Sequence, residues 1–158
     1  MKLTPVEAAF KAALADATDW LVRWPNAGPN YGFPEGVQTT QGGLPLDAEG
    51  EPAPFIDARV IGGETTGSIA PAGSRAMRGY GLLHLYFSVG EGTGTELITA
   101  ETDAVSQAFE RVTVWADPSV GQRLGTLDPR TDDGVAAYEN GDRFVRLVSV
   151  PWFFEYRS

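Results

Sequence analysis

The fold is decided by the stretch Arg78-Gly79-Tyr80-Gly81-Leu82-Leu83-His84-Leu85-Tyr86-Phe87-Ser88-Val89. Its residues alternate between two sets, as expected for a β-strand whose successive side chains point to opposite faces of a sheet. One set is Leu83, Leu85, Phe87 and Val89, and the other is Tyr80, Leu82, His84, Tyr86 and Ser88. Because both sets contain large side chains, we expect both faces of this strand to be covered.

Two helices are predicted, one before and one after this strand. The first begins at Thr4-Pro5-Val6-Glu7, which offers a capping residue, a proline suited to the first helical position and the glutamate of a capping box. Apolar residues then recur at helical spacing as far as Leu21, and the helix ends before the next proline. Thr93 and Glu96 form a second capping box, for a helix that runs to about Arg111.

Further strands are predicted from alternating apolar residues, at Phe55–Glu64, Val112–Trp115, Arg123–Leu127 and Arg143–Tyr156. Pro151 indicates an edge position or a bulge in the last of them. Consecutive strands without helical crossovers favour antiparallel pairing. We therefore predict one α+β domain over residues 1–158, with a mainly antiparallel sheet of four to five strands, two helices packed on one face, and long loops.

Two long segments carry no periodic pattern, residues 26–54 and 117–142, although a short strand interrupts the second. Irregular segments of such length are uncommon in compact domains. They either bind something or are mobile surface, and the sequence leaves both alternatives open.

Composition excludes several classes of protein. The formal net charge of -9 repels nucleic-acid backbones, so tight binding of DNA or RNA is not expected, although an acidic channel wall would let DNA slide past. The absence of cysteine excludes disulfides and thiolate metal sites. Charges interrupt the first 17 residues, and no apolar run approaches the length of a membrane span, so we expect no signal peptide and no membrane association.

No stretch of the chain supports catalysis, a cofactor or a metal. Gly90-Glu91-Gly92-Thr93-Gly94-Thr95 lacks the lysine of a phosphate loop and the glycine pattern of a dinucleotide fold, and it is interpreted as a strand-to-helix turn. The single histidine, His84, has no companion at ligand spacing. The acids around residues 47–51 and 128–133 do not match a calcium loop. We predict no catalytic, cofactor-binding or metal-binding residues.

A set of aromatic residues and one carboxylate are candidates for an interface. Glu101 falls near the middle of an apolar helical stripe, where it needs a partner such as His84, an arginine or a group on another subunit. Alternation at the carboxyl end places Phe153 on one face, which suits the core, and its neighbours on the other, which suits a partner, although a sheet packed on both sides gives the same pattern. The predicted interface residues are Trp24, Tyr31, Phe33, Glu101, Trp152, Phe154 and Tyr156.

Three segments together resemble the tail-terminator-like proteins of tailed bacteriophages. They are an amphipathic first helix that leads into Trp24-Pro25-Asn26, the stretch Arg78–Phe87 that continues through Gly92-Thr93-Gly94 into a helix ending near Phe109, and the terminal strand Val145-Arg146-Leu147-Val148-Ser149-Val150-Pro151. These segments span most of the chain, and it is their order and spacing that carry the resemblance. The segments 26–54 and 117–142 depart from it, so contacts made there are not carried over.

The resemblance implies a structural protein of the virion tail or neck, assembled in the host cytoplasm. Such a protein forms a homohexameric ring that ends polymerisation of the tail tube and then joins the tail to the head connector, while DNA passes through the lumen. The source would be a phage, a prophage or a phage-derived particle such as a gene transfer agent. Alternatives are a tail-completion or tail-tube protein, and, from another class, a small-molecule-binding enzyme that uses Glu101 and the glycine turn.

Overall fold

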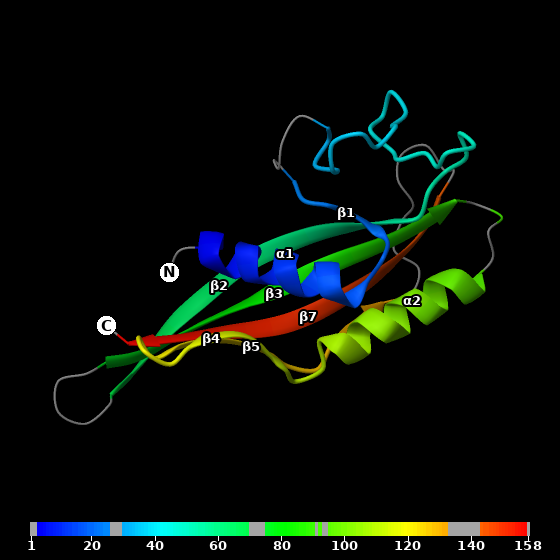
Figure 1. Cartoon of the computed structure of the whole chain (residues 1–158). Coiled ribbons are helices and arrows are strands. Elements are labelled where there is room, and N and C mark those ends of the chain that lie inside the picture. Colours follow the sequence, from blue (N-terminus) through cyan, green and yellow to red (C-terminus); the bar gives the residue numbers. More distant parts are fainter. Residues whose placement is uncertain are drawn as a thin grey trace.

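The structure is a computed structural model that describes residues 3–25, 30–69, 75–90, 92, 95–132 and 143–157. The described residues form two helices, α1 (Leu3–Ala17) and α2 (Thr95–Ala108). They also form seven strands, which are β1 (Leu21–Arg23), β2 (Phe55–Ile69), β3 (Arg75–Gly90), β4 (Thr113–Asp117), β5 (Gln122–Thr126), β6 (Arg130–Asp132) and β7 (Arg143–Arg157). Figure 1 shows the long strands β2, β3 and β7 side by side.

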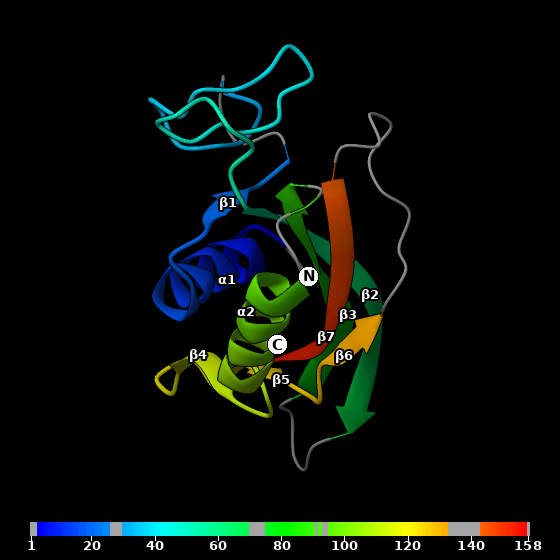
Figure 2. The same cartoon turned by 90° about the vertical axis from the view of Figure 1, so that its right-hand side faces the viewer.

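All seven strands belong to one sheet, in the order β1-β2-β3-β7-β5-β4, with β6 also paired to β7. β1 is parallel to β2, and the other pairs are antiparallel. The sheet curls into a half-barrel, and both helices lie on its concave side (Figure 2). The predicted antiparallel sheet of four to five strands is therefore wrong, because the sheet is mixed and has seven strands.

The two unpredicted strands are short and depend on pairing with distant residues. The first helix was expected to continue to Leu21, but α1 ends at Ala17, and the next residues pair in parallel with the start of β2, where Leu21 lies opposite Phe55. Tertiary pairing thus overrides the helical spacing at Leu21. β6 has three exposed residues and pairs with the middle of β7, so it has no apolar alternation to detect.

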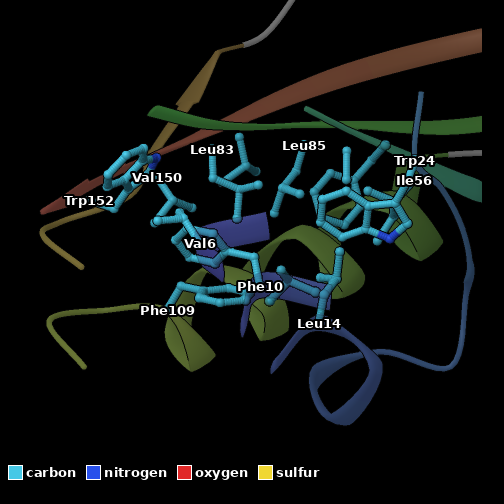
Figure 3. Close-up of a cluster of buried hydrophobic side chains, with 14 of the residues drawn as sticks. Val6, Phe10, Leu14, Trp24, Ile56, Leu83, Leu85, Phe109, Val150 and Trp152 are labelled. Carbon is cyan, nitrogen blue, oxygen red and sulfur yellow. The ribbon is translucent and has the colours of Figure 1, made fainter. Parts of the chain in front are cut away.

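The core lies between the two helices and the concave face of the sheet (Figure 3). α1 contributes Val6, Phe10 and Leu14, which are spaced four residues apart and are fully buried. The Phe10 ring lies 6.1 Å from that of Phe109 and 6.3 Å from that of Trp152. Burying side chains of this size contributes roughly 2 kcal/mol each, so this stripe accounts for the docking of α1.

Pro151 lies within a central strand, which the sequence did not predict. The backbone carbonyl of Pro151 accepts a hydrogen bond of 2.9 Å from the Leu127 amide, on the side of β7 away from β3. In an antiparallel strand the N–H and C=O of one residue point to the same side, so the missing N–H of Pro151 also faces away from β3. On that side, Pro151 lies between the part of β7 that pairs with β5 and the part that pairs with β6, so its nitrogen is not needed for the hydrogen-bond ladder.

Gly81 allows the sheet and a large side chain to approach closely. A Cβ at Gly81 would lie 2.2 Å from the Ile61 backbone oxygen and 2.2 Å from Cζ2 of the buried Trp152. We predict that Gly81→Ala lowers the free energy of unfolding by about 2 kcal/mol, because neither neighbour can move freely. Gly125→Ala is the matched control, since its Cβ meets only the end of the Phe153 ring at 2.4 Å, and it should cost clearly less in urea denaturation. Equal losses would contradict this account.

Candidate functional site

The face of the sheet opposite the helices, called here the outer face, is only partly covered. Ile61, Tyr80 and Leu82 lie on it with 43%, 38% and 37% of their surface exposed. Ile61 pairs directly with Leu82 across β2 and β3, so these side chains are contiguous. We call Ile61, Tyr80, Leu82 and the half-buried Phe153 the outer patch. The expectation that both faces of β3 are covered therefore fails here within the single chain.

Charged residues surround one side of the outer patch. Arg78 and Arg123 both form ion pairs with Glu155, and the Arg123 Nη2 atom lies 3.2 Å from the carboxylate. The two guanidinium carbons also lie 4.9 and 5.1 Å from the Phe153 ring centroid. Burial raises the pKa of Glu155, but the hydrogen bonds from both arginines outweigh burial and hold it below its ordinary value. The carboxylate is thus charged at neutral pH and positions both cations over the ring.

The edge of the sheet formed by β4 carries a second aromatic group. The Trp115 ring is stacked on Phe154 at 6.2 Å, and the Phe154 ring lies 5.9 Å from that of Tyr156. Trp115 is 37% exposed. β4 pairs with β5 alone among the described strands, so its other edge leaves backbone groups unpaired within the sheet. Both features are typical of a surface that another chain completes.

The predicted interface aromatics are mostly buried within the chain. Trp152 is fully buried, and Trp24, Phe33 and Phe154 expose 8%, 4% and 9% of their surface. Trp152 and Phe154 face the helices, which is the reverse of the predicted orientation of this strand. Phe153, which was assigned to the core, lies instead on the outer face.

Two of the predicted interface residues lie partly or largely at the surface. Tyr31 is 55% exposed, in a backbone conformation with φ of 51°. Tyr156 is half-buried beside Phe154. Among the residues that the sequence did not select are Arg78, Arg123 and Phe153. Alternation along the paired strands places these three residues on the same face of the sheet, and this was the available signal. Alternation alone does not tell which face the helices will cover.

Glu101 has a partner that the sequence did not indicate. The Thr18 hydroxyl, which directly follows α1, donates a hydrogen bond to Glu101 Oε1 on α2. The Thr18 oxygen also accepts the Trp20 amide at 3.1 Å. The suggested pairing of Glu101 with His84 is wrong, because His84 lies on the outer face of the sheet. Glu101 therefore joins the end of α1 to α2, while the bond from the Trp20 amide to the Thr18 hydroxyl supports the turn that follows the first helix.

Residues 30–54, the described part of the first long segment and called here the excursion, pack on the outer face at one end of the sheet. Phe33 and Leu44 form a small cluster with Phe55. Buried Arg143 donates hydrogen bonds to the Ala53 carbonyl at 2.7 Å and the Pro45 carbonyl at 3.0 Å. Its guanidinium carbon lies 5.0 Å from the Phe55 ring centroid. The excursion is thus ordered by this chain itself.

Asp47 and Asp128, which were considered as possible calcium ligands, have other partners in the structure. Asp47 accepts the amides of Glu49 and Glu51 at 3.0 and 2.9 Å and so closes a turn. Asp128 pairs with Arg111 at 2.7 Å. Among the described residues no group of three or more histidine, cysteine or acidic side chains could hold a metal ion, and neither described helix is long and apolar enough to cross a membrane.

Some of the predicted features lie outside the described residues, namely Glu91, Thr93, Gly94 and residues 133–142. The second capping box, most of the glycine turn and much of the second long segment are therefore not placed.

No family model and no curated protein matches this chain. A solved structure is similar to it with a TM-score of 0.53 and 16% sequence identity, over 99% of this chain and 96% of that one. The name of that protein states no function. At this identity the likeness concerns the fold alone.

The pKa of His84 reports on the burial and the charge of its surroundings on the outer face. Burial lowers the pKa of His84, and the nearby charge of Arg59 lowers it further. Because the unfolded chain then binds the proton more tightly, stability is highest above the unfolded value of about 6.5 and is lost as pH falls through the folded pKa. We predict that the one imidazole resonance titrates below 6.5 by NMR, and that His84→Asn flattens the loss of stability between pH 7.5 and 5.5. An unchanged pH profile would contradict this.

Arg143 should control the order of the excursion. We predict that Arg143→Met, which keeps the aliphatic stem, removes about 2 kcal/mol of local stability because two carbonyls lose a charged donor. Hydrogen exchange of the Leu46 and Ala53 amides should accelerate, since their bonds to Gln38 and Pro45 lie in this segment. Arg130→Met on exposed β6 is the control and should leave both rates unchanged. Equal exchange in the two variants would show that Arg143 does not hold the excursion.

Proposed function

We propose that this chain is a structural subunit of a phage or phage-derived tail. It assembles with copies of itself into a ring, six-fold by the family resemblance, that caps the head-proximal end of the tail tube. The ring ends tail polymerisation and presents a surface to the head connector. DNA passes through its lumen without tight binding.

The single observation that carries the proposal is the uncovered outer face of β3. Tyr80 and Leu82 alternate with Gly81 and the buried Leu83, so the strand has large side chains on both faces while the chain's own helices cover one. Contiguous apolar surface rimmed by charges is characteristic of an interaction site. A second protein surface is the simplest cover for it, and a protein that acts by assembly requires such a surface.

The edge of β4 that no other described strand pairs with supports assembly in one direction. A sheet edge with an exposed aromatic at Trp115 differs from the opposite edge, where the three residues of β1 are followed by the excursion. Contacts between unlike surfaces are heterologous, and they close into rings when the rotation between copies divides a full turn.

The acidic charge is compatible with a DNA conduit. α2 carries exposed Glu96 and Asp103, and it contains no lysine or arginine. A lumen wall of this kind would repel the phosphate backbone and keep transit fast. Which surface lines the lumen depends on the ring contact.

We predict that the purified protein forms a discrete hexamer, or forms one on meeting tail tubes, and that tubes capped by it stop growing. Leu82→Gln should weaken self-association about tenfold, because it places a polar amide in the outer patch at a cost of about 1.4 kcal/mol. The matched control is Leu97→Gln, at a 43% exposed position on α2, which should assemble normally. Light scattering after size exclusion and electron microscopy of tube lengths give the two readouts.

The other outcomes separate the alternatives. Open-ended polymers would indicate a tail-tube protein. A subunit that joins finished tails without limiting their length would indicate a tail-completion protein. A monomer that is indifferent to concentration and to tail tubes would refute assembly as the function.

A further inference from the structure

The charge of this chain is divided between the two ends of its long strands. The excursion contains Glu35, Asp47, Glu49 and Glu51 and no lysine or arginine. Glu35, Glu49 and Glu51 are exposed. The excursion is therefore a strongly acidic surface, held at the end of the sheet where β2 begins and β7 begins.

The opposite end of the sheet is basic, in a chain whose net charge is -9. Among the side chains that the structure describes there, its outer face presents Arg78, Arg123 and Arg157 beside the carboxylate of Glu155. Arg157 is exposed and lies over Gly121 in the turn between β4 and β5. These arginines border the outer patch on the side of Phe153, so basic and apolar surface are continuous. We call Arg78, Arg123, Arg157 and Phe153 the basic end.

The two surfaces are far apart within one copy. In the register of β3 with β7, Arg78 lies opposite Glu155 and Gly90 lies opposite Arg143. The twelve residue steps from Arg78 to Gly90 span roughly 40 Å at the rise of a β-strand. Figure 1 shows the excursion at one end of these strands and the carboxyl terminus at the other. An acidic excursion cannot reach the basic end of its own chain, but it can reach that of a neighbour.

We propose that copies of this chain join head to tail, with the acidic excursion of one copy seated on the basic end of the next. This inference rests on the proposed self-assembly and specifies its contact surfaces. Contacts between two basic ends or two acidic excursions repel, so a two-fold dimer through either surface is disfavoured. Head-to-tail contacts are heterologous, as a ring requires.

The chemistry of the basic end suits a carboxylate-rich partner. The Arg78 and Arg123 guanidinium groups are already oriented by Glu155 and by the Phe153 ring, so little side-chain entropy is lost on binding. Arg123 contacts Glu155 through Nε and Nη2, and because a guanidinium carries five N–H groups, a second carboxylate can also accept from Arg123. Tyr80 and Leu82 beside them supply apolar area that the charges alone lack.

The test uses charge reversals in the full chain. Arg123→Glu with Arg157→Glu makes the basic end acidic and keeps the Arg78–Glu155 pair. Glu35→Lys with Glu49→Lys and Glu51→Lys makes the excursion basic, at three exposed positions. Asp19→Lys with Asp103→Lys and Glu110→Lys is the control for the excursion variant, because it also replaces three exposed acids by lysine, but elsewhere on the surface. Circular dichroism and urea denaturation establish that each variant is folded.

Each reversal variant should self-associate at least tenfold more weakly than the unmodified chain and the control. An equimolar mixture of the two reversal variants should recover the original mass, because alternating copies restore every contact in an even-membered ring. Assembly of the unmodified chain should weaken as salt is raised.

The outcomes keep this inference separate from the proposed function. A ring that forms equally well from the reversal variants overturns the contact and leaves the function standing, whereas an unmodified chain that never assembles refutes both. A mixture that stays monomeric also overturns the head-to-tail contact. If Arg123→Glu with Arg157→Glu assembles normally but loses binding to a labelled single-stranded DNA oligonucleotide, the basic end is a nucleic-acid surface and the inference is wrong.

Discussion

The long antiparallel pairing of β3 with β7 is the constraint on which the rest of this structure depends. The register runs from Ala76 opposite Arg157 to Gly90 opposite Arg143, and it assigns a face to every residue of both strands. Leu83 and Val150 fall under the helices, while Tyr80 and Phe153 fall outside. A slip by one residue would exchange the two sets. Core and candidate interface are thus fixed by the same hydrogen-bond ladder.

The two faces of this sheet carry different kinds of interaction. On the concave face, Phe10 and Trp152 meet across the core, and the apolar area removed from water holds the helices in place. On the outer face, Arg78 and Arg123 are held by Glu155 and by the half-buried ring of Phe153, and much of their charge remains at the surface. A single chain can bury only one of these faces fully, because its helices lie on one side. The other face retains the apolar and charged groups through which we propose that copies meet.

Sequence patterns located the long helices and strands because the hydrophobic period of each one can be detected in its own residues. α1, α2, β2, β3 and β7 each carry a clear period, and each predicted segment overlaps most of the observed element, although the first helix ends earlier and β2 ends later than predicted. The short strands β1 and β6 have three residues each and depend on pairing with residues far along the chain. Such strands have almost no local signal, so the mixed, seven-stranded sheet could not be predicted from periodicity.

The sequence by itself determined the helices, the long strands, the acidic net charge and the absence of cysteine chemistry, because each follows from composition or from local spacing. Only the tertiary structure decided that Phe153 lies outside and Trp152 inside, that Glu101 pairs with Thr18, and that Arg143 holds the excursion. Alternation along a strand separates two faces but does not say which one the helices will cover. That choice is made by the fit of α1 and α2 against the whole sheet, which no local pattern contains.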